Sequence, residues 1–169
     1  MQNGSRLLLI CIFLLVLQAC TTTDKKAATA LSKTITTIND TVFYIGKIWG
    51  ENVGQAVVTK DYTVVAAARV RQLNYLDGAL QTVANMHDVG GSEDLCNHEL
   101  DFLKFEKQMF TNVAAIERFN ATTSDEEVLK SLSDLKLVSK RETDMLTNIQ
   151  ILQNAYAARN GLVLDSVKK

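Results

Sequence analysis

The stretch ITTINDTVFYIGKIWGENVGQAV, residues 35–57, decides the fold class of this chain. Its apolar side chains recur in steps of three and four residues, at Ile35, Ile38, Val42, Ile45, Trp49, Val53 and Val57. This spacing places them on one face of an α-helix, because an α-helix turns once every 3.6 residues. The pattern predicts a first long helix over residues 27–59.

Three further apolar stripes follow this segment. The second stripe precedes the paired glycines at residues 90–91 and comprises Val64, Ala67, Val70, Leu73, Leu76, Leu80 and Val83. The third comprises Leu95, His98, Phe102, Phe105, Met109, Val113 and Ile116, and we expect its helix to end near residues 119–120. The fourth comprises Val128, Leu132, Leu135, Val138, Met145, Ile149, Leu152 and Tyr156. Each stripe has the length and spacing of an amphipathic helix.

Local start and stop signals separate these helices to different degrees. Ser92 is an expected N-cap, because two acidic residues follow it. Ser124 and Glu127 have the spacing of a capping box, and Gly161 is an expected helix end. The boundary near residues 60–61 is weakly marked, so the first two helices could also be continuous.

Composition supports an all-α domain. The chain has 169 residues with no proline and only 8 glycines, so few positions force a helix to break. Val, Thr and Ile are common, which keeps a β alternative open, but hairpin turn signals are scarce. We expect one domain over residues 27–169, an antiparallel bundle of about four long helices.

The first 26 residues have the composition of an export signal followed by a tether. Arg6 precedes the apolar run at residues 7–17, and polar residues follow at 21–26. A positive residue before about a dozen apolar ones is typical of a secretory signal. The run is too short for a permanent span, which needs about 20 apolar residues.

The end of this run reads Leu17, Gln18, Ala19, Cys20 and resembles the lipobox of bacterial lipoproteins. The resemblance implies that residues 1–19 are a cleaved signal peptide. It also implies that Cys20 carries lipid, with palmitate-like acyl chains, and that residues 20–26 are a lipidated tether. Thr21 implies sorting to the outer membrane, with the domain facing the periplasm. Each buried methylene contributes about 0.8 kcal/mol, so two or more chains anchor a protein stably. An uncleaved signal anchor and a secreted protein with a chance cysteine remain the alternatives.

Charge and motif content argue against several function classes. The formal net charge of −1 does not fit a nucleic-acid-binding protein, which needs clustered Lys and Arg. The sequence contains neither a Gly-x-Ser-x-Gly motif nor a phosphate-binding glycine-rich loop. Only His87 and His98 are available for proton transfer by an imidazole. We therefore expect a non-enzymatic protein without a cofactor.

Cys96 and His98 are the residues from which a metal site could be drawn. Asp94 and Asp101 could share a helical face with His98, but Cys96 would point elsewhere, and no paired-ligand spacing occurs. We expect no metal, a core or boundary role for His98, and a small buried hydrophobic role for Cys96. A disulfide between chains remains the alternative for Cys96.

The glycines at 46, 50 and 54 lie along one ridge of the first helix. Glycine at every fourth position allows another helix to come close. The ridge of Gly46, Gly50 and Gly54 therefore indicates either a tight crossing within the fold or a surface for a partner helix or a second copy.

We expect this chain to be a lipid-anchored protein-interaction module. Its partners would be the membrane, through the lipid, and another envelope protein or a second copy of itself, with no nucleic acid. An exposed apolar patch is expected at Phe43, Tyr44, Ile48 and Trp49. The alternative is a carrier that holds a lipid or small hydrophobic ligand between its helices, which an enclosed apolar cavity above about 300 Å³ would favour.

Overall fold

The structure is a computed structural model that describes the backbone of residues 3–163, and the side chains of residues 24–163 apart from that of residue 137. It is an all-α bundle, with no strand in the described residues. Its elements are α1 (Asn3–Thr59), α2 (Thr63–Ala84), α3 (Glu93–Asn112), the short 3₁₀-helix η1 (Val113–Arg118) and α4 (Asp125–Arg159). The predicted fold class is therefore confirmed.

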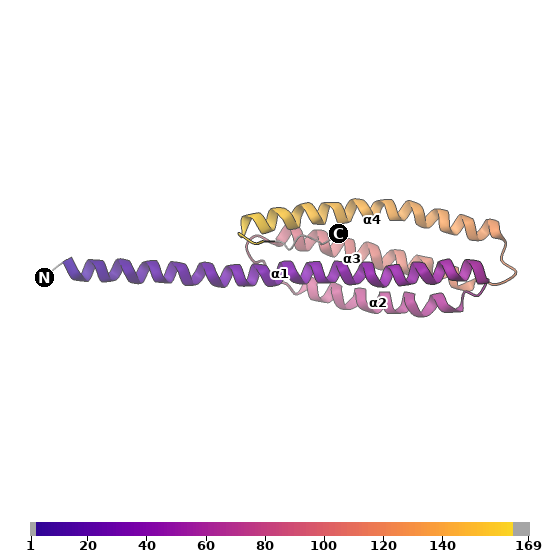
Figure 1. Cartoon of the computed structure of the whole chain (residues 1–169), viewed down its shortest axis with the longest axis horizontal. Helices are drawn as coiled ribbons and strands as arrows, with labels where there is room; N and C mark the ends of the chain where they lie inside the picture. The colour runs from indigo at the N-terminus through magenta and orange to yellow at the C-terminus, as the bar shows by residue number, and fades with distance from the viewer. Residues whose placement is uncertain (1–2, 164–169) are drawn as a thin grey trace.

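The helices pack in chain order and alternate in direction. α1 packs on α2, α2 on α3 and α3 on α4, while α1 and α4 contact each other far less (Figure 1). The N-terminal part of α1 extends beyond the end of the bundle (Figure 1). Within the described part of the chain, no helix contains an apolar stretch long enough to cross a lipid bilayer.

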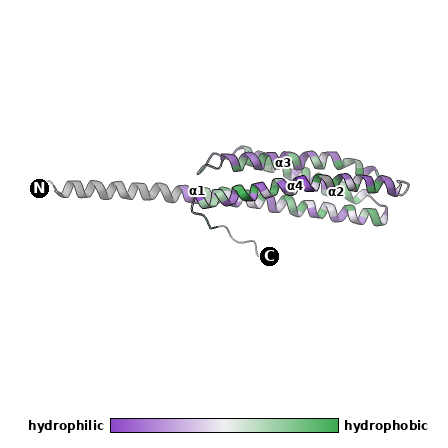
Figure 2. Ribbon diagram, turned by 90° about the horizontal axis from the view of Figure 1, so that it is seen from above, coloured by the Kyte–Doolittle hydropathy of each residue, from purple (hydrophilic) through white to green (hydrophobic). Residues whose placement is uncertain are grey.

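Among the described side chains, the first buried one is Ala28, and the first predicted stripe is confirmed along α1. Six of its members are buried, namely Ile35, Ile38, Val42, Ile45, Trp49 and Val53, and Val57 is half-buried. Figure 2 shows hydrophobic residues mainly where helices meet, and hydrophilic residues mainly on the outside. The burial of one stripe per helix supplies the hydrophobic stabilisation of the bundle.

A definite break separates α1 from α2. Lys60 has a φ of 60°, a left-handed conformation that ends a helix. Asp61 then accepts hydrogen bonds from the Thr63 backbone nitrogen at 3.0 Å and the Thr63 hydroxyl at 2.6 Å. This local turn satisfies a free N–H group at the start of α2. Lys60 also forms an ion pair with Asp125, which joins the α1–α2 turn to the start of α4.

The loop from α2 to α3 is held by the end of α4. Tyr156 donates a hydrogen bond to the Val89 carbonyl oxygen at 3.0 Å, and the Asn160 amide donates one to the Gly90 carbonyl oxygen at 3.1 Å. Gly90 has a φ of 59°, and a Cβ atom there would lie 2.1 Å from the Asn160 side-chain oxygen. This close approach requires glycine at position 90.

The second predicted stripe is wrong in its first half. Val64 and Val70 are 40% and 47% exposed, whereas α2 buries Val65, Ala68, Gln72, Leu76, Ala79 and Val83. The predicted stripe advances in steps of three from Val64 to Leu76. Each such step falls about 60° short of a full turn, so the stripe rotates away from the core.

The third predicted stripe is confirmed at its four buried members, Leu95, Phe102, Val113 and Ile116, but it wrongly includes His98 and leaves out Glu99 and Glu106. α3 buries Leu95, Glu99, Phe102, Leu103, Glu106 and Phe110, whereas His98 is exposed. The Ser92 hydroxyl does not cap α3, because it accepts a hydrogen bond from the Val89 nitrogen at 3.1 Å. The expected cap of α4 is present, since the Ser124 side chain accepts from the Glu127 nitrogen at 3.2 Å.

The two ends of the bundle differ in their relation to the N-terminus. The proximal end, defined here by Ala28, the α2–α3 loop and Asn160, lies toward the N-terminal part of α1. The distal end, defined by Lys60 and Asp125, lies opposite.

Candidate functional site: an opening between α1 and α4

The predicted lipidation site, Cys20, lies outside the described side chains, as do the other residues of the lipobox. The candidate site is instead formed by residues within the bundle.

One stripe of α1 faces α4 but is covered only near the proximal end. Gln153 of α4 donates a hydrogen bond to the Thr36 hydroxyl at 3.2 Å. Phe43 and Gly50 follow Thr36 at intervals of seven residues, so all three lie on nearly the same side of α1. Phe43 is nevertheless 68% exposed, and no atom would lie within 4 Å of a Cβ at Gly50. α4 therefore contacts α1 at Thr36 and leaves the stripe uncovered at Phe43 and Gly50, before the Lys60–Asp125 ion pair joins the two elements again at the distal end.

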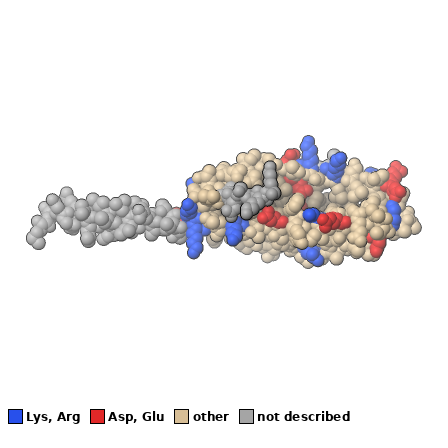
Figure 3. All heavy atoms as spheres, viewed as in Figure 1, with Lys and Arg blue, Asp and Glu red and all other residues tan. Residues whose placement is uncertain are grey.

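A groove of about 350 Å³ lies between α4 and the end of α3 with η1. Its floor comes from the end of α3 and from η1, and its wall from the first half of α4. The lining residues are Met109, Asn112, Val113, Ala115, Ile116, Ser131, Asp134, Leu135 and Val138. No described residue of α1 lines the groove, which is open to solvent rather than enclosed. Figure 3 shows acidic and basic side chains scattered over the face of the bundle seen in Figure 1.

The glycine ridge of α1 makes no tight crossing within the described bundle. A Cβ at Gly46 would meet only the Phe110 ring, at 3.9 Å, which is an ordinary contact distance. Gly50 and Gly54 have open space on that side. The expectation of a tight helix crossing within the fold is therefore wrong at Gly50 and Gly54. That the ridge binds a partner helix or a second copy stays a prediction.

The expected patch of Phe43, Tyr44, Ile48 and Trp49 does not form one exposed surface. Phe43 and Tyr44 are 68% and 63% exposed, and Ile48 is half-buried. Trp49 is only 7% exposed, because its ring packs edge-on against Phe110 with the ring centroids 5.3 Å apart. Including Trp49 was wrong, since it belongs to the core stripe. Adjacent Phe43 and Tyr44 also point about 100° apart around the helix.

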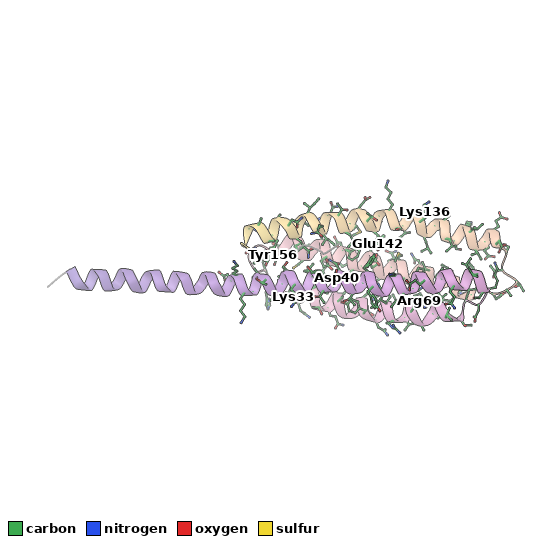
Figure 4. All side chains as sticks on the ribbon, viewed as in Figure 1. Lys33, Asp40, Arg69, Lys136, Glu142 and Tyr156 are labelled. Atoms are coloured by element: carbon green, nitrogen blue, oxygen red, sulfur yellow. The ribbon has the colours of Figure 1, made fainter. Side chains whose placement is uncertain are left out.

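Two carboxyl groups lie on α3 and α4, the helices that line the groove, but closer than the groove to the proximal end of the bundle. Glu142 precedes Gln153 on the inner face of α4, seven residues after the groove residue Leu135. Glu106 lies seven residues before the groove residue Val113 on α3. Figure 4 shows Glu142 on the side of α4 toward the other helices, while Lys136 points away from the bundle.

Burial controls the ionisation of these acids. Glu106 is 2% exposed, and burial followed by repulsion from Glu142 raises its pKa to about 8. Burial also raises the pKa of Glu142. Within the described residues, Glu106 Oε1 has no hydrogen-bond partner, and no salt bridge reaches either carboxyl group. In the described structure, therefore, no basic side chain forms an ion pair with Glu106 or Glu142.

A second buried acid, Glu99, has a different environment. The Asn39 amide of α1 donates a hydrogen bond to Glu99 Oε2 at 3.1 Å. Burial raises the pKa of Glu99 to about 7, although the bond from Asn39 acts in the opposite direction. Gln72 of α2 is also fully buried and donates to the Val42 carbonyl oxygen at 3.2 Å. Polar side chains of α2 and α3 thus occupy core positions and form hydrogen bonds to α1.

Sequence reasoning missed all of these polar core residues. The stripes were traced through apolar side chains, and acidic residues are almost never buried without partners. A usable signal existed, since Glu99 and Glu106 have the heptad spacing and alternate with Phe102, Leu103 and Phe110. Reading the apolar residues Leu95, Phe102 and Phe110 as one face would have placed both acids inside the bundle.

Cys96 and His98 do not form a site together. Cys96 is half-buried, and burial raises the pKa of its thiol. It lines a small pocket of about 130 Å³ with Val83, Met86, Asp88, Ser92 and Leu100 among its neighbours. His98 is exposed, with Nδ1 2.9 Å from the Asp94 carbonyl oxygen, which corrects its expected core or boundary role. Among the described residues, no cluster of His, Cys, Asp or Glu could hold a metal ion.

Comparisons with known proteins identify no family for this chain, so only its fold class is known. No protein-family model matches the chain, and searches of curated proteins and of solved structures find no significant match. The fold and the site together define an all-α bundle with a solvent-open groove, a buried Glu106 and a half-buried Glu142.

Proposed function

We propose that this protein is a bacterial lipoprotein whose helical bundle binds another envelope protein near a membrane, without enzymatic activity. The observation that carries this proposal is the uncovered α1 stripe, where Phe43 is 68% exposed beside bare backbone at Gly50. A stripe with core-like spacing that its own bundle leaves uncovered is suited to docking another helix.

The tether length supports action close to the membrane. Ala28, the first buried residue described, follows Cys20 by eight residues. The six residues between Cys20 and Ala27 span at most about 20 Å when fully extended. Lipid at Cys20 would thus keep the proximal end at the bilayer surface, most simply at the periplasmic face of the outer membrane.

The carrier of a lipid or small hydrophobic ligand is the second candidate, favoured by the volume of the groove. A groove of about 350 Å³ reaches the lower range of ligand pockets. It is open, however, and Asn112, Ser131 and Asp134 contribute polar groups to its lining. An apolar ligand would remain partly in contact with water there, so protein docking fits the groove better.

The test combines lipidation with crosslinking at the opening. Full-length wild type and Cys20→Ala are produced in a bacterial host, and intact mass and membrane fractionation are measured. A photocrosslinking amino acid at position 50 then reports proteins that contact the uncovered stripe. We expect a lipid-sized mass gain and membrane retention for wild type only, and a crosslinked envelope protein from the membrane fraction.

The matched control places the crosslinker at Arg71, an exposed position of α2. Crosslinking at 50 but not at 71 would support docking at the opening. A wild type without added lipid would contradict the anchor, whereas a lipidated protein with equal crosslinking at both positions would contradict the docking surface.

A further inference from the structure

We propose that Asn160 is a site of spontaneous deamidation, and that the product releases α4 from the α2–α3 loop at the proximal end of the bundle. The site is separate from both the lipid anchor and the docking surface proposed above, and its chemistry needs only water.

The reaction depends on the residue that follows Asn160. Among the asparagines within residues 24–163, only Asn160 precedes a glycine. Asparagine is a chemically labile residue, and glycine has no side chain to shield its backbone nitrogen. The Gly161 nitrogen attacks Cγ of Asn160, so that an N–Cγ bond forms and the Cγ–Nδ2 bond breaks. Nδ2 leaves as ammonia with the proton from the Gly161 nitrogen. Water then opens the cyclic imide to aspartate or isoaspartate, without any change of oxidation state.

The folded turn keeps the two reacting groups engaged elsewhere. The Asn160 amide nitrogen donates hydrogen bonds to the Gly90 carbonyl oxygen at 3.1 Å and to the Tyr156 carbonyl oxygen at 2.9 Å. The Gly161 nitrogen donates to the Ala158 carbonyl oxygen at 3.3 Å. Ring closure requires these bonds to break, so the folded turn protects Asn160.

The contacts that hold this turn against the α2–α3 loop are few and lie at a helix end. They form the proximal clamp, defined here as three hydrogen bonds in which Tyr156, Arg159 and Asn160 donate to the carbonyl oxygens of Val89, Gly91 and Gly90, respectively. Tyr156 lies near the proximal end of α4 (Figure 4). The bonds from Arg159 and Asn160 are exposed to solvent. Helix ends open locally at a much smaller free-energy cost than the whole fold, so Asn160 reacts from a locally open state.

The product cannot re-form the same clamp. An aspartate at position 160 has no amide hydrogens, so the carbonyl oxygens of Gly90 and Tyr156 lose their donor. Its negative charge also lies at the C-terminal end of α4, where the helix dipole disfavours anions. Isoaspartate adds a carbon to the backbone and displaces Leu162, whose nitrogen donates to the Ala157 carbonyl oxygen at 2.9 Å. Deamidation is therefore a one-way release of the loop from α4.

The rate of deamidation tests whether the clamp controls the reaction. The purified full-length protein is incubated at mildly alkaline pH, and mass spectrometry of its peptides, digested at mildly acidic pH, follows conversion at each asparagine. Tyr156→Phe keeps the ring but removes the hydroxyl bond to the loop. We expect it to speed conversion at residue 160 at least about threefold, because the net contribution of one hydrogen bond corresponds to a several-fold change in opening. Arg159→Ala is a second variant that loosens the clamp, with the same expectation.

Two controls separate the site from general instability. Asn154 is exposed on the same helix and precedes an alanine, so it should stay unconverted in the same molecules. Gly161→Ala should nearly abolish conversion at residue 160, because the methyl group shields the attacking nitrogen. Circular dichroism establishes that each variant retains the bundle.

Release of the loop is measured separately by hydrogen–deuterium exchange of residues 86–92. Asn160→Asp reproduces the aspartate product, and Asn154→Asp is the matched control for the added charge. We expect exchange in the loop to rise at least about threefold for Asn160→Asp only, because the loop then loses a hydrogen bond to α4.

Each part of the proposal has an outcome that would overturn it. Conversion at residue 160 that is no faster than at Asn154 would remove the site. Equal rates in wild type, Tyr156→Phe and Arg159→Ala would remove the control by the clamp, and unchanged loop exchange in Asn160→Asp would remove the release. Faster conversion in the loosened variants, together with faster loop exchange in Asn160→Asp, would support the proposal.

Discussion

Glu106 of α3 and Glu142 of α4 interact across the α3–α4 interface without a neutralising base in the described residues. Burial and the nearby carboxylate raise the pKa of Glu106 to about 8, so it is mainly protonated at neutral pH. A carboxylic acid kept neutral in a core is inexpensive to bury, whereas the ionised form is costly. This relationship gives the bundle a pH-dependent stability.

The unfolding free energy should fall as pH rises from about 4.5 to about 8. Glu99 and Glu106 have folded-state pKa values of about 7 and about 8, above the ordinary value of 4.5. The folded state therefore binds protons more tightly, and stability is lost as pH rises through this window. The loss should be on the order of a few kcal/mol. Urea unfolding at pH 5, 6.5 and 8 measures it, and a stability that rises over this range would contradict the burial of these acids.

Glu106→Gln should stabilise the bundle at pH 8 and have little effect at pH 5. Glutamine has the shape of the protonated acid but cannot ionise, so the cost of a buried charge disappears. We expect a gain on the order of 1–3 kcal/mol at pH 8. Glu126→Gln, at an exposed position, is the control. Equal effects at both pH values would show that ionisation of Glu106 does not affect folding.

Asn39→Ala should destabilise the bundle because it removes a hydrogen bond to a buried acid. The Asn39 amide donates to Glu99 Oε2 at 3.1 Å, and Glu99 is fully buried. Leaving a buried polar group without its partner costs about 1–3 kcal/mol. Losing a donor that favours the ionised form should also raise the pKa of Glu99 further. Thermal unfolding beside Asp40→Ala, an exposed neighbour, measures the effect, and equal losses in both variants would argue against the bond.

Gly90→Ala and Gly50→Ala should have opposite effects on stability. At Gly90 the positive φ and the Asn160 side chain 2.1 Å from a Cβ both oppose alanine, so we expect a loss of about 1–3 kcal/mol. At Gly50 the Cβ meets open space in a helix, where alanine is favoured by up to about 1 kcal/mol. Chemical denaturation compares them. A loss at Gly50 comparable to that at Gly90 would show that the α1 stripe is covered in solution.

A bulky residue at position 50 should separate stability from partner binding. Gly50→Leu adds a side chain to the open face of α1 and should leave the unfolding free energy within about 0.5 kcal/mol of Gly50→Ala, as is usual for exposed sites. It should nevertheless reduce the amount of envelope protein that co-purifies from the membrane fraction, because close approach to the backbone is lost. Unchanged co-purification would place the docking surface elsewhere.

The accuracy of the sequence predictions depended on what each helix buries. The α1 stripe was predicted correctly, because its core positions are nearly all apolar and its spacing alternates between three and four. The α2 stripe was misplaced in its first half, and the α3 stripe was incomplete, because Gln72, Glu99 and Glu106 occupy core positions there. A pattern of hydrophobicity cannot include such residues, since their burial depends on partners from other helices.

By itself, the amino-acid sequence determined the helical class, the approximate number of helices, the core face of α1, the cap of α4 and the expectation of a lipid anchor at Cys20. These follow from local properties, namely periodicity, capping residues and a short motif. Only the tertiary structure decided that Glu106 is buried, that α4 leaves α1 uncovered at Phe43 and Gly50, and that Glu106 and Glu142 lie together. Those features depend on how four helices diverge and rotate against one another, which is set by packing between residues distant in sequence.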